Sequence, residues 1–122
     1  MDLEALRGIY AADIVTFDVQ QPLRRVGLEG KLQNWVEAFA AFQPPLEYEL
    51  RDVTITVGGD LAFAYGLGRL SGTLKNGERA GGFWVRFTGC LRRIDGTWLI
   101  VHDHGSVPLD LESGRAALNL EP

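Results

Sequence analysis

The chain has 122 residues, of which 46% are hydrophobic and 23% charged, and its formal net charge is −4. This length suits a single domain, 1–122. Nucleic-acid binding requires a basic surface, but the basic residues form only short pairs such as Arg24-Arg25, so we expect no nucleic-acid binding. The sequence has neither an apolar run of the roughly 20 residues that a membrane helix needs nor a secretion signal at its start, so we expect a cytoplasmic protein without a membrane partner.

The first predicted element is a helix over Leu3–Ala11, where apolar residues recur at helical spacing and Asp2 can act as the N-cap. A short strand follows over Ile14–Val19, rich in β-branched and aromatic residues. Asp18 is the one charged residue of this strand. The segment Gln20–Gly27 shows little periodicity and is expected to be a loop.

The second predicted helix covers Leu28–Phe42, and Pro44-Pro45 is expected to end it. Apolar and aromatic residues at helical spacing predict a buried stripe on this helix, formed by Leu32, Trp35, Val36, Phe39 and Phe42. A helix with such a stripe covers one face of another element rather than standing free in solvent.

From this point the apolar period changes to two, which is typical of strands. Leu46–Val57 alternates, but its parity reverses at Arg51-Asp52, so we predict a bulge there. Turn-forming residues separate two further predicted strands, Leu61–Thr73 and Ala80–Arg93. The tail after Pro108 is expected to be loosely ordered.

The Asp95-Gly96 pair predicts a tight hairpin at the end of the sheet. The strand after it carries both histidines of the chain, His102 and His104, which share one face because side chains alternate along a strand, while Asp103 points to the other face. A shift of one residue exchanges the two faces, so which one lines the interior stays open, although we favour the register with Asp103 inside. Two histidines alone do not complete a metal site, and we expect neither a metal nor another cofactor.

Helices followed by an antiparallel meander predict an α+β domain in which the helices cover one face of a curved, cone-shaped sheet. Asp18, at the end of an apolar strand beneath an aromatic helix, would be partly desolvated and could act as a general base. The alternative is that Asp18 accepts hydrogen bonds from nearby backbone N–H groups. Cys90, the lone cysteine, cannot form an internal disulfide and is expected to be a small core or interface residue.

Two segments carry a resemblance to a known family: Leu6-x-x-x-Tyr10-x-x-Asp13-x-Val15-x-Phe17-Asp18 and Arg92-Arg93-x-Asp95-Gly96-x-Trp98-x-Ile100-Val101-His102-x-His104-x-Ser106-x-Pro108. They resemble SnoaL-like proteins of the nuclear transport factor 2-like, ketosteroid isomerase-like superfamily, and also the association domain of calcium/calmodulin-dependent kinase II. The resemblance implies a cystatin-like cone and a homodimer that packs through the outer sheet face. It also implies that 1–122 lacks the first helix with which such domains usually begin.

The resemblance further implies site residues. Asp18 matches the general base of the isomerases, whereas the position of their second oxyanion donor falls near Gly89, which has no side chain. The remaining candidate ligand-binding residues come from three segments. Alignment places Phe63, Tyr65 and Arg69 on the cavity side, opposite the helix stripe that supplies Trp35 and Phe39, and alignment on the kinase association domain places Asp103 on the cavity face as well. The implied function is binding of a small apolar, carbonyl-containing or anionic ligand, with proton transfer of the isomerase or cyclase type. The alternative is a non-catalytic ligand-binding or dimerisation domain.

Overall fold

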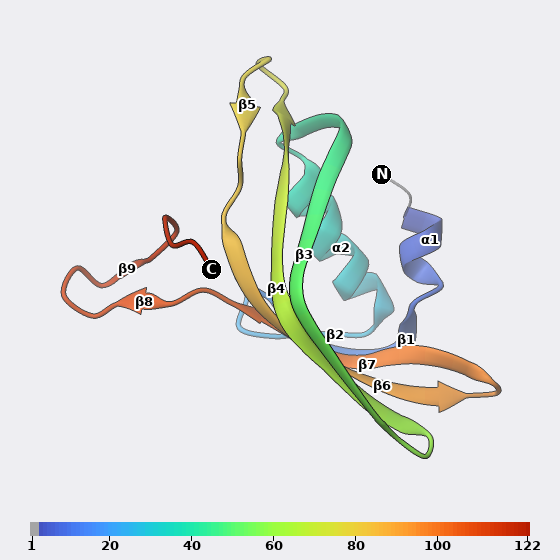
Figure 1. Ribbon diagram of the computed structural model, residues 1–122. Coiled ribbons are helices and arrows are strands. Elements are labelled where there is room, and N and C mark those ends of the chain that lie inside the picture. The colour runs from blue at the N-terminus through green and yellow to red at the C-terminus, as the bar shows by residue number, and fades with distance from the viewer. Residues whose placement is uncertain (1–2) are drawn as a thin grey trace.

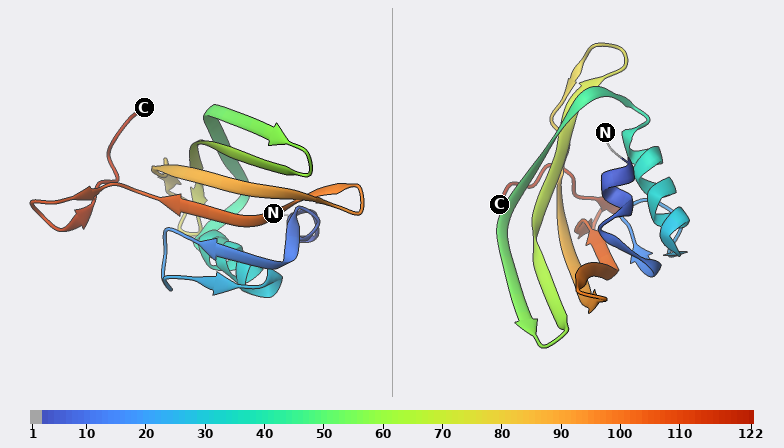
Figure 2. Two further views of the ribbon diagram at one scale, coloured as in Figure 1. Left: turned by 90° about the horizontal axis from the view of Figure 1, so that it is seen from below. Right: turned by 90° about the vertical axis from the view of Figure 1, so that its right-hand side faces the viewer.

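The computed structural model describes residues 3–122 and consists of two helices on one face of a curved sheet (Figures 1 and 2), which confirms the predicted α+β class. The strands of the sheet run in the order β2-β1-β7-β6-β4-β3, and β5 pairs with β4. The helices are α1 (Leu3–Arg7) and α2 (Leu28–Phe39), and the strands are β1 (Tyr10–Phe17), β2 (Arg25–Val26), β3 (Phe42–Gly58), β4 (Leu61–Leu74), β5 (Arg79–Ala80), β6 (Trp84–Ile94), β7 (Thr97–Ser106), β8 (Leu109–Asp110) and β9 (Arg115–Ala116).

The N-terminal helix is shorter than predicted, because α1 ends at Arg7 and β1 begins at Tyr10. The backbone N–H of Gly8 bonds to the carbonyls of Glu4 and Ala5, and glycine is a poor residue for continuing a helix. Tyr10 fits helical spacing in the sequence, but its backbone pairs with β7. The predicted cap, Asp2, lies outside the described residues.

The second helix also ends earlier than predicted. Phe42 starts β3 and pairs with Leu74, so it is not the last member of the helical stripe. Pro44 and Pro45 lie inside β3, at an irregularity in its pairing with β4, rather than ending the helix. β3 is the edge strand of the sheet, and an edge tolerates prolines because a backbone N–H on its free side needs no partner.

Two local predictions in the sheet are confirmed. The pairing of β3 with β4 shifts register between Arg51 and Thr54, and Asp52 has a positive φ of 56°, as expected of a bulge. Asp95 and Gly96 form the two-residue turn between β6 and β7, with φ values of 50° and 81°. Positive φ at both central residues is what a type I′ hairpin requires.

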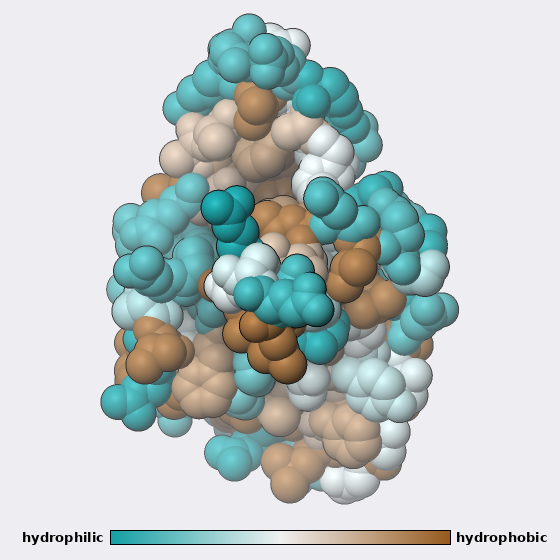
Figure 3. Space-filling view, turned by 90° about the vertical axis from the view of Figure 1, so that its left-hand side faces the viewer, coloured by the Kyte–Doolittle hydropathy of each residue, from teal (hydrophilic) through white to brown (hydrophobic). Residues whose placement is uncertain are grey.

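The C-terminal segment was predicted to be loosely ordered, and this was wrong. It forms a small hairpin of β8 and β9, in which Leu109 pairs with Ala116, and the N–H of Ala117 bonds to the carbonyl of Pro108 at 2.8 Å. Figure 3 looks onto this side of the molecule, where apolar side chains are scattered among polar ones. Leu111 at the hairpin tip is 88% exposed.

One strand pair departs from the antiparallel meander. β1 lies parallel to β7, with Val15 opposite His102 and Phe17 opposite His104 (Figures 1 and 2). β1 and β7, which are the first and last strands of this sheet in chain order, are therefore neighbours within it. The segment after β1 is thereby brought to the end of β7.

The core is concentrated between α2 and β1. Ile14 is fully buried, and Leu32 of α2 is 4% exposed. On the same face of the sheet but further from α2, Tyr48 and Leu50 of β3 are 52% and 57% exposed. The space between α2 and β3 is therefore open to solvent at this edge. Within residues 3–122, no helix combines the length and the apolar composition needed to cross a membrane.

Candidate functional site

The centre of the site is Lys31 of α2, which is only 4% exposed. Its Nζ lies 2.9 Å from Oδ1 of Asp18 and 2.9 Å from Oδ2 of Asp103. It also donates to Oγ1 of Thr16 at 3.2 Å. A helix, the end of β1 and β7 thus each contribute to one buried cluster of charges, which we call the Lys31 cluster: Thr16, Asp18, Lys31 and Asp103.

Thr16 joins the two carboxylates of the Lys31 cluster. Its side chain is fully buried, and its Oγ1 lies within hydrogen-bond distance of Asp18 Oδ2, at 2.9 Å, and of Asp103 Oδ1. A hydroxyl has a single proton, so it can donate to one carboxylate at a time. With both aspartates ionised, the cluster carries a net charge of −1, and part of its acceptor capacity remains free.

Lys31 is held in its charged form. Burial alone would lower its pKa, but Asp103, Tyr10 and Asp18 raise it, and the pKa ends above its ordinary value. A lysine in this state does not act as a nucleophile, because nucleophilic attack needs the neutral amine. Its contribution is a fixed positive charge beside two carboxylates.

Aromatic side chains form one wall beside the cluster. The Nε1–H of Trp35 donates to the hydroxyl oxygen of Tyr10 at 2.8 Å, and Nζ of Lys31 lies 5.4 Å and 5.6 Å from the centroids of these two rings. Trp35 also stacks on Phe39, with the ring centroids 5.2 Å apart. One member of the predicted aromatic stripe of α2, Trp35, therefore lies next to the charged centre.

Tyr48 of β3 approaches from the sheet. Its hydroxyl lies over Gly68 of β4, where an added Cβ would come within 2.5 Å of the hydroxyl oxygen. Glycine is therefore required at this position for the close approach of the ring. Partial burial raises the pKa of Tyr48, and the positive charge of Lys31 opposes that rise, so the phenol lies within electrostatic reach of the cluster.

A shallow cleft of about 740 Å³ gives solvent access to Asp18. Its lining includes Asp18, Gln20, His104 and Ser106, from the end of β1, the following loop and the end of β7. Gln20 is fixed by a hydrogen bond of 3.1 Å to the backbone carbonyl of Asn34 on α2. Asp18 thus belongs both to the buried cluster and to a surface that a ligand can reach.

Comparison with known proteins identifies the family. A family model described as SnoaL-like domain matches residues 1–110. The chain belongs to the SnoaL-like domain family. No curated protein matches this SnoaL-like domain.

Solved structures agree with this assignment. An NTF2-like protein of unknown function from Pseudomonas putida KT2440 is 31% identical, with a TM-score of 0.86 over 99% of this chain and 83% of its own. A ketosteroid isomerase-like protein from Erwinia carotovora atroseptica is 21% identical, with a TM-score of 0.67 over 86% of this chain and 80% of its own. An uncharacterised protein with a cystatin-like fold from Caulobacter vibrioides is 15% identical, with a TM-score of 0.68 over 91% and 79%. The last two similarities concern the fold alone.

In this SnoaL-like domain the favoured orientation of β7 is confirmed. Asp103 points towards α2 and contacts Lys31. His102 points away from α2, and its Nδ1 bonds to the backbone carbonyl of Val15 at 2.6 Å. The ring of Phe17 packs edge-on against both histidines, with centroids 4.7 Å from His102 and 5.6 Å from His104. The histidines therefore belong to the outer sheet face.

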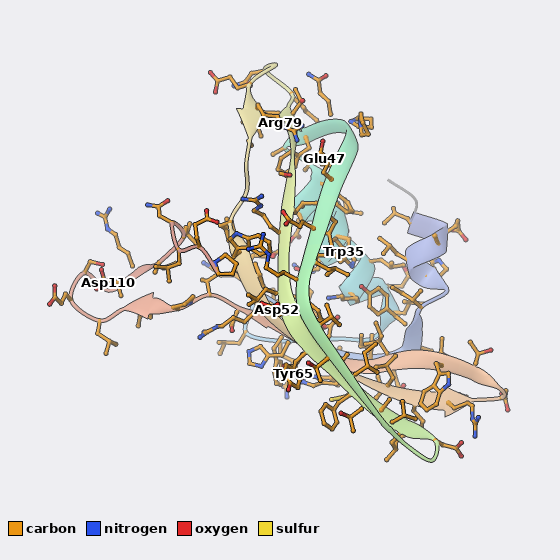
Figure 4. All side chains as sticks on the ribbon, viewed as in Figure 1. Trp35, Glu47, Asp52, Tyr65, Arg79 and Asp110 are labelled. Atoms are coloured by element: carbon orange, nitrogen blue, oxygen red, sulfur yellow. The ribbon has the colours of Figure 1, made fainter. Side chains whose placement is uncertain are left out.

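Three predicted cavity residues, Phe63, Tyr65 and Arg69, lie on the other side of the sheet, and their predicted placement was wrong. Gly68 is the β4 residue beneath Tyr48, so its odd-numbered neighbours point outwards. Arg69 donates to Glu49 at 3.0 Å on this outer face. The rings of Phe63 and Tyr65 stack 6.4 Å apart and are 44% and 48% exposed. In Figure 4, Tyr65 lies well apart from Trp35.

Lys31 was missed by the sequence analysis, although a signal was present. It precedes Trp35 by four residues, which places both on one face of a helix. A lysine within an aromatic stripe is expected to extend its ammonium group into solvent. Lys31 is buried instead because the carboxylates of Asp18 and Asp103 both pair with its charge. Within residues 3–122, no group of three or more His, Cys, Asp or Glu side chains is arranged to hold a metal ion.

Proposed function

We propose that this SnoaL-like domain binds a small carbonyl-containing ligand beside the Lys31 cluster and moves a proton on it, with Asp18 as the base. The observation that carries the proposal is the buried contact of Lys31 with both Asp18 and Asp103, at 2.9 Å each. Burying ions costs several kcal/mol per charge, and apolar replacements are often no less stable. An ion cluster that also reaches a cleft is therefore a candidate for chemistry rather than for stability.

The charges of the cluster suit a base that gains and returns a proton. Before the transfer, Lys31 is balanced by two carboxylates, of which Asp18 also lines the cleft. After Asp18 takes a proton from the ligand, Asp103 alone balances Lys31 and the cluster is neutral. Asp103 thus keeps the lysine paired in both states, and no buried charge is left uncompensated.

The surroundings favour an apolar ligand with a neutral carbonyl group. Phe17, Pro22 and Leu23 line the cleft beside Asp18, and the ring centroid of Trp35 lies 5.6 Å from Nζ of Lys31. An anionic ligand would meet the net negative charge of the cluster, so it is the less favoured of the two ligand types named by the resemblance.

Hydrogen–deuterium exchange tests this proposal without knowledge of the natural substrate. In D2O, the protein is expected to speed deuterium incorporation next to the carbonyl of at least one member of a panel of small ketones and enones, followed by NMR. Replacing Asp18 by Asn should slow this exchange by about a hundredfold, within the usual contribution of a general base. Asp13→Asn is the matched control, because Asp13 is an exposed residue of β1.

Undiminished exchange by Asp18→Asn would contradict the role of Asp18. Binding of panel members by the wild-type protein with no exchange of any of them would favour the non-catalytic ligand-binding alternative.

We also propose that two copies associate through the outer sheet face. The support is the exposed, stacked pair of Phe63 and Tyr65 on that face, beside the Phe17 ring and its two histidines. A face with apolar and polar groups can pair with its own copy about a two-fold axis. Light scattering should give twice the 13.5 kDa mass of one chain, and Phe63→Glu should shift the mass to that of the monomer. A monomeric wild-type protein would overturn this.

A further inference from the structure

The cleft that reaches Asp18 has a second wall, formed by the end of β7. His104 and Ser106 lie two residues apart on one face of this strand, and both line the cleft. Phe17, the residue of β1 opposite His104, lines it too, and Asp18 follows Phe17 directly. Neighbouring strands lie about 4.8 Å apart, so one small molecule in the cleft can contact both Asp18 and Ser106.

Ser106 can donate a hydrogen bond to a ligand in the cleft. Its Oγ accepts the Nε–H of Arg86 at 3.2 Å, and the two residues are directly opposite each other in β7 and β6. Among residues 3–122, no acceptor is in place for the Ser106 O–H. A hydroxyl that accepts from one partner still has its own proton to give, so the Ser106 O–H is available to an acceptor in the cleft.

Arg86 places a positive charge next to this donor. The residue is exposed, and within the described part of the chain no carboxylate forms an ion pair with its guanidinium. The two walls of the cleft therefore differ in sign, because Asp18 belongs to the net negative Lys31 cluster and Ser106 is bonded to an unpaired cation. An anionic group in the cleft is repelled by the first wall and attracted by the second.

We propose that Ser106 and Arg86 bind a carboxylate of the ligand, and that this domain therefore accepts small keto acids. The inference rests on the proposed function, which it deepens by naming the substrate class. The neutral carbonyl lies beside Asp18, and the carboxylate is held at Ser106, away from the net negative charge of the Lys31 cluster. A carboxylate carries a single charge and matches one guanidinium, whereas a phosphate group carries about −1.5 to −2.

The position of this carboxylate site keeps it accessible. Ser106 is the last residue of β7, so the site lies at the end of the outer sheet face and opens into the cleft. The cleft volume of about 740 Å³ is within the range of sites for small molecules.

Two probes of similar shape test the site separately from turnover. 4-Acetylbenzoate carries a ketone and a carboxylate, and 4-acetylbenzamide has a neutral amide in place of the carboxylate. In titrations followed by NMR at low salt, the wild-type protein should bind the benzoate about fivefold more tightly than the benzamide, the upper end of what an exposed ion pair contributes. Arg86→Gln should abolish this preference. Ser106→Ala should lower it about twofold, because the charge of Arg86 remains.

Arg92→Gln is the matched control. Arg92 lies in the same strand and on the same face as Arg86, since they pair with Leu61 and Leu67 of β4, and it too is exposed. The two arginines are six residues apart, which is about 20 Å along a strand. Arg92→Gln removes the same charge from the protein but should keep the full preference for the benzoate.

Equal binding of the two probes by the wild-type protein would overturn the inference, and so would the absence of binding of both. A preference that survives Arg86→Gln, or that Arg92→Gln removes equally, would also contradict it. Asp18→Asn should keep the preference even though it loses proton transfer. A preference without deuterium exchange in the wild-type protein would thus retain the carboxylate site and refute the proposed base, and exchange without a preference would do the reverse.

Discussion

Replacing Lys31 by Met is expected to lower the free energy of unfolding by about 3–5 kcal/mol at neutral pH, the range found when one partner of a buried ion pair is removed. Methionine fills most of the space of lysine but leaves Asp18 and Asp103 facing each other without a cation. Their side chains are only 14% and 20% exposed, so water can compensate little of the repulsion.

The same residue should govern stability in alkali. The pKa of Lys31 is raised in the folded protein, because Asp103, Tyr10 and Asp18 together outweigh the lowering effect of burial. The stabilisation of the folded state by charged Lys31 is therefore fully present below the pKa of an unfolded lysine, about 10.4, and is lost as the pH rises through the pKa of Lys31 in the folded protein. Burial also raises the pKa of Tyr10, so above about pH 10 this residue too makes the folded protein less stable as the pH rises. Lys31→Met should lose less stability than the wild type between pH 9 and 11.

Urea unfolding from pH 7 to pH 11 measures both effects. Lys75→Met is the matched control, since Lys75 is the other lysine of the chain and lies exposed in the turn after β4. Adding Asp103→Asn to Lys31→Met should recover part of the loss, because one unpaired charge disappears. A loss no larger than that of Lys75→Met would show that the Lys31 cluster does not stabilise the fold.

Ile14→Ala is expected to cost about 2–5 kcal/mol, and Ile14→Val about 0.5–1.5 kcal/mol, as is usual for shortened core side chains. Ile14 is fully buried in β1, between the sheet and α2, and its backbone carbonyl accepts the N–H of Gly27 at 2.7 Å. A cavity here loosens the attachment of α2, which carries Lys31 and Trp35. The effect should therefore reach the site as well as the core.

The measurement is again urea unfolding, combined with the fluorescence of the tryptophans. Ile9→Ala is the control, because Ile9 is 43% exposed and its truncation creates no closed cavity. If Ile14→Ala and Ile9→Ala lowered the free energy of unfolding equally, the contact between β1 and α2 would not form the core of the domain.

Local signals in the sequence predicted the local features well. The Asp95-Gly96 turn and the bulge at Arg51-Asp52 depend on a few adjacent residues, and both are present. Tyr10 and Phe42 were assigned to helices, because an apolar residue at the end of a helical pattern fits a strand equally well. Their strand pairing depends on β7 and β4, which the local pattern does not contain.

The site was predicted in part. Asp18 and Asp103, which the resemblance placed on the cavity side, both contact Lys31, and Trp35 of the predicted stripe lies close to the same lysine. The face of β4 was misassigned, since a shift of one residue turns every side chain to the other side, and the parity is set by distant partners. Burial of Lys31 depends on carboxylates that are 13 and 72 residues away in the chain, so helical spacing alone could not reveal it.

The parallel pairing of β1 with β7 has a consequence for synthesis of the protein. Thr16 and Asp103 are 87 residues apart, yet their side chains meet in the site. A ribosome makes about 5–20 residues per second, so the N-terminal strand and α2 exist for several seconds before β7 emerges. During that interval Lys31 and Asp18 lack their third charged partner. The pairing of β1 with β7 therefore completes the site last, and a chain interrupted before β7 would lack Asp103 and with it the complete cluster.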